Sequence, residues 1–508
     1  MLARDILKLD VEIEEKYPVD VWEIDGIKVW PLIRISLNFQ LQKIENKENI
    51  QVEYQSERRM FKAGKVLKRG TDLLNREARL IRSNIADWSH QDRMHKSDIF
   101  FMTDNMDRVF PMLDGTLYDR VLDPLKDAFI GLGYNIFSME EINGEKVKLP
   151  RYSNSSFYQI QDDMIRVKKF INRRSSAVGD DDYLPEFEKF VAECSKYGVN
   201  IRISNLIRQV NYIIKAKEYF QHVLQKCGTK IVITRCWYVM RKMALCAAAK
   251  EMKIPIVDIQ HGVAGGGEHH LYCQWTKMPE NGYELIPNVF WCNTEADAEA
   301  IRNWQHTDIH TKVIVGGRSL QLFWDSDKGH QLTAYYMDCF RKKIEVPENS
   351  KVVLLSLQSL FKNTERYPEW LPDFISKNNE FFWLIRRHPM MDETQKEFLH
   401  KISGITNINV EEASRYPLDV LLELSDVHVT MFSTVAMEAA EHGVGTVFLT
   451  DSRDYSAVVP QKYIFHGLSY KMLKDCLNEA VRRKSGAVKD KRGMAAVREL
   501  EALMGRKE

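Results

Sequence analysis

Two stretches of the chain alternate short apolar runs with segments of helical periodicity. Runs of four to eight mostly apolar residues between turn residues are typical of buried strands of a parallel sheet. Each run is followed by a segment with apolar residues three and four positions apart, as in a helix that covers a sheet. The expected strands lie in 97–104, 134–139, 230–238, 254–262, 287–293 and 312–319, and then in 351–360, 380–389, 407–412, 427–432 and 444–450.

This alternation predicts the α/β class, with two doubly wound, Rossmann-like domains that face a cleft. We expect an N-terminal appendage, mainly helical, over residues 1–97. The first doubly wound domain then covers 98–318 and the second 319–475. A helix and a basic tail at 476–508 complete the chain.

The appendage contains a basic amphipathic segment at 57–82. It holds nine Lys or Arg residues against three acidic ones, and its apolar residues recur at helical spacing. Such a helix can attach to an anionic membrane surface. It can equally be a solvated helix whose apolar stripe packs on the next domain.

Composition and charge exclude several classes of protein. At 508 residues, with 44% hydrophobic and 28% charged residues, the chain is long enough for two or three ordinary domains. The net charge of +1 gives no global attraction for nucleic acid. The eight scattered cysteines form no C-x-x-C pair, no apolar leader precedes the first domain, and no apolar run reaches about 18 residues. We therefore expect reduced thiols and a cytoplasmic protein.

The clearest candidate site is FSTVAMEA at 432–439. A buried strand delivers Ser433 and Thr434 to the start of a helix, where hydroxyl and N–H groups can bind a phosphate. Glu438 lies four residues after Thr434 and shares its face, so it can accept hydrogen bonds from a ribose. A plain N-cap with a solvated glutamate is the alternative interpretation.

A second candidate is the segment RRHP, in which Arg386, Arg387 and His388 follow a strand that ends before Pro389. Cationic side chains at this place can neutralise a departing phosphate, as a metal ion would otherwise do.

In the first domain, the strand that ends at Gln260 is followed by His261, Gly262 and a glycine-rich turn. An imidazole can remove a proton from a hydroxyl near neutral pH, so His261 is a candidate general base. A structural histidine, or a metal site with His269 and His270, are the alternatives. Asp114, in a loop after another strand, is the rival base. Asp107 and Gly317 are further candidates for the cleft.

The chain has no G-x-x-x-x-G-K-[ST], no well-placed G-x-G-x-x-G and no G-x-S-x-G. P-loop NTPases, dinucleotide oxidoreductases and α/β-hydrolases are therefore disfavoured.

The segments QHG (260–262), RRHP (386–389) and FSTVAMEA (432–439) resemble bacterial GT-B glycosyltransferases of capsule and lipopolysaccharide assembly. The similar groups are the sialyl- and polysialyltransferases, the Kdo transferases and the CDP-glycerol glycerophosphotransferases. Val263 stands where the CDP-glycerol glycerophosphotransferases have a threonine. The acidic-Gly motif of the sialyl- and polysialyltransferases is absent unless Asp114-Gly115 stands in for it. Retaining GT-B families usually carry two glutamates eight positions apart in this helix region. Eight positions after Glu438 this chain has Thr446, so the second glutamate is missing.

The resemblance implies an inverting transfer that needs neither metal nor cofactor. A sugar would pass from a nucleotide donor, CMP-linked by preference, to a hydroxyl of a bacterial surface glycan or glycolipid. His261 or Asp114 would be the base, while Arg386, Arg387, His388, Ser433 and Thr434 would hold the phosphate and Glu438 the ribose. The 57–82 helix would dock on the inner membrane. A nucleotide-sugar epimerase on the same fold and a non-catalytic glycan or lipid-carrier binding protein remain as alternatives.

Overall fold

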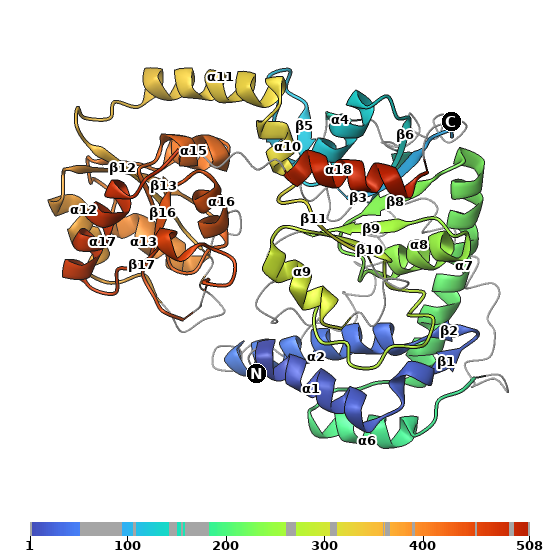
Figure 1. Ribbon diagram of the computed structural model, residues 1–508. Helices are drawn as coiled ribbons and strands as arrows, with labels where there is room; N and C mark the ends of the chain where they lie inside the picture. The colour runs from blue at the N-terminus through green and yellow to red at the C-terminus, as the bar shows by residue number, and fades with distance from the viewer. Residues whose placement is uncertain are drawn as a thin grey trace, which may run out of the picture. The chain divides into compact units, whose positions relative to one another are not determined.

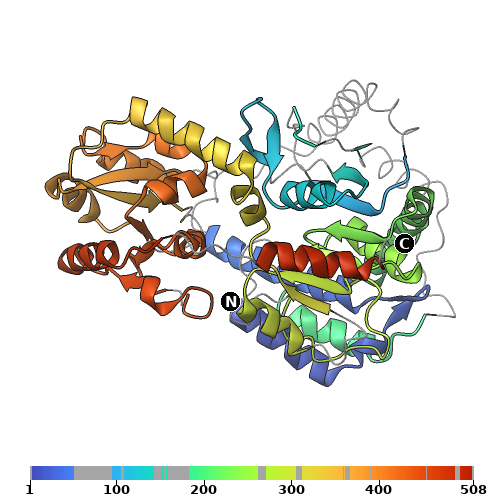
Figure 2. The same cartoon turned by 45° about the horizontal axis from the view of Figure 1, so that its top comes forward.

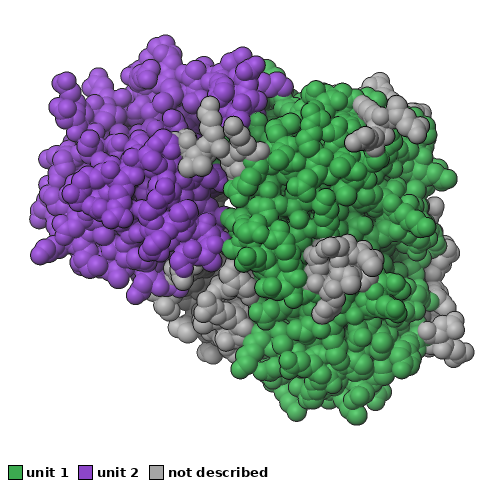
Figure 3. All heavy atoms as spheres, in the orientation of Figure 1, with its two compact units in different colours: residues 1–322, 492–508 green, residues 323–491 purple. Residues whose placement is uncertain are grey.

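The computed structural model describes residues 3–50, 94–104, 108–141, 150–153, 156–157, 182–260, 271–304, 312–358, 360, 366–388, 392–452, 455–486 and 492–505 (Figure 1). The chain divides into two compact units, shown in different colours in Figure 3. Unit 1 contains residues 1–322 and 492–508, and unit 2 contains residues 323–491. The predicted boundary at 318/319 falls close to the division at 322/323.

Unit 1 is built on a seven-stranded sheet in which all neighbours run parallel, in the order β11-β10-β9-β8-β3-β6-β7. Its strands are β3 (Ile99–Asp104), β6 (Ile136–Glu141), β7 (Ser156–Phe157), β8 (Ile231–Thr234), β9 (Ile256–Ile259), β10 (Val289–Cys292) and β11 (Lys312–Val315). A two-stranded antiparallel ribbon, β4 (Arg108–Pro111) and β5 (Leu117–Asp119), follows the carboxyl end of β3.

Both faces of this sheet are buried, because alternate residues of each strand enter different cores. On β3, Phe100 and Met102 belong to one apolar cluster, and Ile99 and Phe101 to the other. Helices α4 (Asp123–Gly131) and α18 (Arg492–Leu503) supply the second cluster (Figure 2). The first cluster takes its side chains from α1 (Ala3–Lys16), α2 (Trp30–Ile50), α6 (Phe187–Lys196), α7 (Ile203–Cys227), α8 (Met240–Glu251) and α9 (Glu295–Arg302).

The described N-terminal residues, which include the short ribbon of β1 (Glu23–Ile24) and β2 (Ile27–Lys28), are part of the unit 1 core and do not form a separate appendage. The buried guanidinium of Arg34 on α2 donates to Glu14 Oε1 at 2.7 Å and to the carbonyl of Cys273 at 2.9 Å. Burial raises the pKa of the neighbouring Asp10 to about 7. The sequence pattern missed this packing because it depends on the distant segment around Cys273. The predicted basic helix at 57–82 lies outside the described residues.

Unit 2 repeats the same design with six parallel strands in the order β14-β13-β12-β15-β16-β17. They are β12 (Lys351–Ser356), β13 (Phe381–Arg386), β14 (Ile408–Asn409), β15 (Val427–Thr430), β16 (Gly445–Phe448) and β17 (Ile464–His466). Its helices are α11 (Asp327–Lys343), α12 (Leu371–Lys377), α13 (Glu393–Lys401), α14 (Glu411–Arg415), α15 (Leu418–Leu424), α16 (Val435–Glu441) and α17 (Tyr470–Arg482), while α10 (Leu320–Trp324) contains the division between the units.

A polar group lies in the middle of the unit 2 sheet. His428 on β15 is fully buried, with Nδ1 3.0 Å from Thr446 Oγ1 on β16 and Nε2 3.0 Å from Ser356 Oγ on β12. Burial lowers the pKa of His428 to about 3, so the ring is neutral. Three adjacent strands are thereby linked by side-chain hydrogen bonds as well as by their backbones.

Numbered along the chain, the strands of unit 2 have the spatial order 3-2-1-4-5-6, and those of unit 1 have the same order with a seventh strand added. This is the order of doubly wound Rossmann folds, so the predicted fold class is confirmed. The sequence did not predict β7, β17 or the β4–β5 ribbon. The predicted C-terminal segment 476–508 is divided, since α17 belongs to unit 2 and α18 to unit 1.

Candidate functional site

Each sheet has a place where the strand order reverses, between β12 and β15 in unit 2 and between β3 and β8 in unit 1. Connections from the two strands at such a place leave in opposite directions, so a crevice opens beyond their carboxyl ends. Ligands of open α/β sheets bind in that crevice. The residues at the carboxyl ends of these strands are therefore the candidates for a binding site.

In unit 2, the side chain of Gln358 bridges the reversal point. Gln358 follows β12, and its Oε1 accepts hydrogen bonds from Thr430 Oγ1 at 3.0 Å and from the backbone N–H of Phe432 at 2.7 Å. The hydroxyl of Tyr367 accepts from the Gln358 N–H at 2.7 Å and donates to its carbonyl at 2.9 Å. The ends of β12 and β15 are thus fixed to one another, and sequence reasoning had not singled out Gln358.

The predicted hydroxyl residues come directly after this bridge. Ser433 is partly exposed, and its Oγ accepts from the N–H of Val435 at 3.3 Å. Thr434 is exposed at the start of α16, and its hydroxyl forms no hydrogen bond with the described residues. Glu438 lies one turn further along α16 and is partly exposed. The structure therefore places all three side chains where solvent, or a small ligand, can reach them.

The guanidinium of Arg386, the last residue of β13, is hydrogen-bonded to the backbone of unit 2. Its Nη1 donates to the carbonyls of Ala413 at 3.0 Å and Tyr416 at 2.6 Å. These bonds hold the segment that follows α14 against the end of the strand. This guanidinium is consequently less available to a phosphate than the sequence motif suggested.

The backbone N–H groups of Arg387 and His388 both donate hydrogen bonds within unit 2. The Arg387 N–H donates to Ser414 Oγ at 3.1 Å, and its Nη2 lies 3.1 Å from Glu411 Oε2 in a largely exposed ion pair. The His388 N–H donates to the buried Gln395 Oε1 at 3.0 Å. An exposed ion pair contributes little stability, so an anion can compete for the Arg387 side chain at small cost.

The two predicted motifs of unit 2 end at the same edge of the sheet. β13 and β15 are the two neighbours of β12, so Arg387 and Ser433 follow strands separated by two strand spacings, about 10 Å. Gln358 stands between them. One small ligand can touch both sides, with cationic groups on one side and hydroxyl groups on the other.

At the reversal point of unit 1 the structure places a buried ion pair. Asp104, the last residue of β3, pairs with Arg235, which follows β8. Lys242 Nζ lies 3.5 Å from Asp104 Oδ2 and donates to the Arg235 carbonyl at 2.7 Å. All three side chains are buried, so they fix the edge of the sheet and are not exposed to a ligand.

The neighbouring strand β9 carries a second buried acid that the sequence did not reveal. Asp258 Oδ2 accepts from the hydroxyl of Tyr272 at 2.8 Å, and Oδ1 accepts from the Trp237 N–H at 3.1 Å. Burial raises the pKa of Asp258 to about 7. Gln260, two residues further on, accepts from the N–H of Asn293 through Oε1 at 2.7 Å.

The remaining candidates of unit 1 divide into two groups. His261, Gly262 and Asp107 lie outside the described residues. Asp114 caps the turn of the β4–β5 ribbon, because its Oδ1 accepts from the N–H and the hydroxyl of Thr116 at 2.9 and 2.7 Å. Gly317 has a φ of +71° and accepts from Trp291 Nε1 at 2.7 Å. These contacts support the fold and leave the choice of base open.

No family model matches the sequence, and no curated protein matches it. UDP-GlcNAc 2-epimerase from Neisseria meningitidis, whose structure contains UDP-GlcNAc, is similar over 80% of this chain and 100% of its own, at 15% identity and a TM-score of 0.46. The epimerase from Methanocaldococcus jannaschii is similar over 80% and 99%, at 14% identity and 0.49. CalG4, the calicheamicin glycosyltransferase, is similar over 80% and 94%, at 12% identity and 0.38.

Likenesses of this strength do not establish a shared function. The fold is assigned from the strand order of the two sheets. The narrower resemblance to sialyl- and Kdo transferases stays a prediction.

Proposed function

We propose that this protein is an inverting glycosyltransferase that binds a nucleotide-sugar, CMP-linked by preference, at the carboxyl edge of the unit 2 sheet. The observation that carries the proposal is the bridge from Gln358 to Thr430 and Phe432 at the reversal point of the strand order. It fixes an edge with cationic residues on one side and accessible hydroxyl groups on the other.

In the proposed reaction, a base removes the proton of an acceptor hydroxyl and the oxygen attacks the anomeric carbon of the donor sugar. The bond from that carbon to the nucleotide phosphate breaks in the same displacement. Arg387, His388, Ser433 and Thr434 stabilise the negative charge on the leaving phosphate, and Glu438 binds the ribose. His261 and Asp114 are the proposed alternatives for the base. Since cationic side chains take the charge, EDTA should leave the activity unchanged.

The donor site is tested by thermal unfolding with CMP, CDP, UMP, UDP, GDP and dTDP. A ligand that binds only the folded protein raises its melting temperature. We expect one base to stabilise the wild type and to lose most of its effect in His388→Ala. His400→Ala, which removes an exposed histidine on α13, is the matched control and should respond as the wild type does. Equal responses of His388→Ala and the wild type would refute the phosphate site.

Product analysis separates transfer from the two alternatives. A transferase consumes the donor rapidly only when an acceptor is present, and it inverts the anomeric configuration. An epimerase converts the donor without any acceptor. A binding protein of glycans or lipid carriers shows no affinity for nucleotides.

The proposed acceptor is a hydroxyl of a bacterial surface glycan or glycolipid, met at the inner membrane surface. In the described parts of the chain, every helix is too short or too polar to cross a bilayer. The basic segment 57–82, with nine Lys or Arg residues against three acidic ones, is the proposed docking element. Flotation with vesicles of anionic lipid tests it, since removal of 57–82 should abolish co-flotation while neutral vesicles should bind neither protein.

A further inference from the structure

A groove in unit 1 lies between α2, α7 and the start of α8. It consists of two adjoining cavities of about 350 and 460 Å³, which share Ser36, Gln40, Gln209, Tyr212 and Met240. Volumes of this size are typical of sites for small molecules. None of the candidate residues predicted from the sequence lines this groove.

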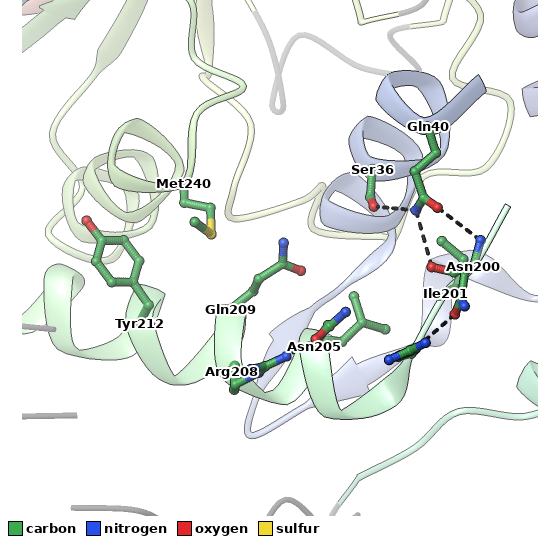
Figure 4. Close-up of a pocket in the computed structure, with 11 residues that line it drawn as sticks. Ser36, Gln40, Asn200, Ile201, Asn205, Arg208, Gln209, Tyr212 and Met240 are labelled. Atoms are coloured by element: carbon green, nitrogen blue, oxygen red, sulfur yellow. Dashed lines mark hydrogen bonds between the residues drawn. The ribbon is translucent and has the colours of Figure 1, made fainter. Parts of the chain in front are cut away.

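One half of the groove is lined by side-chain amides. Gln40 on α2 accepts from the N–H of Asn200 at 2.9 Å, and its Nε2 donates to Ser36 Oγ at 3.2 Å and to the Asn200 carbonyl at 3.3 Å (Figure 4). Gln209 on α7 points from the opposite side toward the space near Met240 (Figure 4) and forms no hydrogen bond with the described residues. Amides both donate and accept, as sugar hydroxyls do, so the two pair readily.

The other half is apolar. It is formed by Leu32, Ile35, Phe39, Val239 and Met243, and Phe39 is 49% exposed. Aromatic rings and thioether groups pack against the C–H faces of sugar rings. A groove with amides along one wall and an aromatic and aliphatic surface along the other fits a carbohydrate chain better than an acyl chain, which would leave the Gln209 amide without a partner.

The charged residues of the lining have one sign. Arg202, Arg208 and Arg241 line the two cavities, and neither cavity has an acidic residue in its lining. Arg241 is balanced by the buried Glu141, 2.6 Å away. The Arg202 Nε donates to the neutral Asn200 Oδ1 at 3.2 Å, so its charge is available to an anionic ligand.

The groove also extends toward the carboxyl edge of the sheet. Tyr238 and Arg241 line the second cavity, and they follow β8, one of the two strands at the reversal point. A chain that lies in the groove therefore has one end near the edge at which ligands of this fold bind.

We infer that this groove binds an acidic oligosaccharide. Its role as the acceptor site for transfer rests on the proposed function, whereas the glycan binding itself does not. The amide of Gln209 would bind sugar hydroxyls, Phe39 would pack against a ring face, and Arg202 would pair with a carboxylate or phosphate of the chain.

The test is binding of the full-length protein to immobilised oligosaccharides that carry uronic acid, sialic acid or phosphate, with neutral oligosaccharides of equal length beside them. We expect at least one acidic class to bind about tenfold more tightly than its neutral counterpart. Gln209→Leu, which keeps the side-chain size, should weaken binding about fivefold. Arg202→Gln should remove the preference for acidic chains. Lys215→Gln, also on α7 but outside the lining, is the matched control.

Three outcomes would overturn the inference: no acidic class binds, neutral chains bind as well as acidic ones, or Gln209→Leu and Arg202→Gln bind as the wild type does. Binding of a fluorescent fatty acid tests the alternative ligand. If Gln209→Leu binds it more tightly than the wild type does, the groove is a site for an acyl chain. The nucleotide response of the groove variants should be unchanged. Glycan binding without any nucleotide response would refute the proposed function and leave the groove inference in place.

Discussion

His428 shows how a single buried side chain makes the unit 2 sheet sensitive to pH. The ring is neutral and fully buried, and burial lowers its pKa from 6.5 to about 3. Above pH 6.5 the ring is neutral in both the folded and the unfolded chain, so its titration contributes nothing. Below pH 6.5 the unfolded chain binds a proton that the folded chain does not accept until about pH 3.

We therefore expect His428 to reduce the free energy of unfolding of unit 2 by about 2 kcal/mol between pH 7.5 and pH 5.0. Urea unfolding at the two pH values measures the loss. His428→Gln keeps a donor and an acceptor but does not titrate, so its loss over this range should be smaller by that amount. An equal loss in both proteins would contradict the buried neutral ring.

A pair of substitutions at Gln358 separates structure from ligand binding. Gln358→Leu leaves the buried Phe432 N–H without its acceptor, which should destabilise unit 2 by about 1–3 kcal/mol. The Thr430 hydroxyl keeps the Ser356 carbonyl, 3.1 Å away, as an acceptor. Gln358→Glu keeps an acceptor at this position but adds a negative charge beside the proposed phosphate site. We expect the urea midpoint of Gln358→Glu to lie closer to that of the wild type than the midpoint of Gln358→Leu does. Gln358→Glu should nevertheless lose more of the stabilisation by nucleotide than Gln358→Leu. Nucleotide stabilisation retained in Gln358→Glu would place the phosphate elsewhere.

Among helices and strands, the long apolar runs were the predictable part. Runs such as FFWLI and VVLLS form buried strands because nearly continuous apolar sequence is stable only when both faces of the strand are covered. Their alternation with helical segments predicted the doubly wound class. The strands β7 and β17, of two and three residues, were missed because so few positions carry no periodicity. The Gln358 bridge was missed for another reason, since its partner Thr430 is 72 residues away and only the pairing of β12 with β15 brings them together.

Helix α18 was predicted as part of a terminal tail, but it completes the unit 1 core. Ala496, Val497 and Leu500 are buried in the cluster that contains Trp291 and Ile314, and Tyr134 donates to Glu501 Oε1 at 2.8 Å. Its periodicity indicated an amphipathic helix but could not indicate which domain it covers.

Leu500→Ala should consequently destabilise unit 1 by about 2–5 kcal/mol, because it leaves a cavity in a core. Glu499→Gln changes the adjacent residue, whose exposed pair with Lys312 contributes little, and should shift stability by less than about 0.5 kcal/mol. Thermal unfolding of the two variants measures the difference. A wild-type melting temperature for Leu500→Ala would show that α18 does not pack as described.

For the molecule as a whole, the chain passes from unit 1 into unit 2 and back. It leaves after Leu322 and returns at Arg492. The two crossing points are adjacent, because a Cβ added at Gly493 would lie 2.9 Å from Leu322 Cδ2. Unit 2 is thus an insertion with both ends at one place, which is the arrangement that tolerates excision best.

A fragment of residues 323–491 should fold on its own. We expect a single cooperative transition in urea and the same nucleotide selectivity as the full-length protein, since the proposed donor residues all lie within the fragment. Circular dichroism and thermal shift measure both properties. A fragment that folds but does not respond to the nucleotide of the full-length protein would assign part of the donor site to unit 1.

The return of α18 to unit 1 affects how the protein is made. The ribosome synthesises every strand of the unit 1 sheet, then the whole of unit 2, and only afterwards the helix that covers Trp291 and Ile314. During that interval unit 2 can fold as a unit, while the part of the unit 1 core that α18 covers remains exposed to chaperones and proteases. Translation that stops after unit 2 would therefore yield a product that carries the proposed donor site beside a unit 1 whose core lacks its last helix.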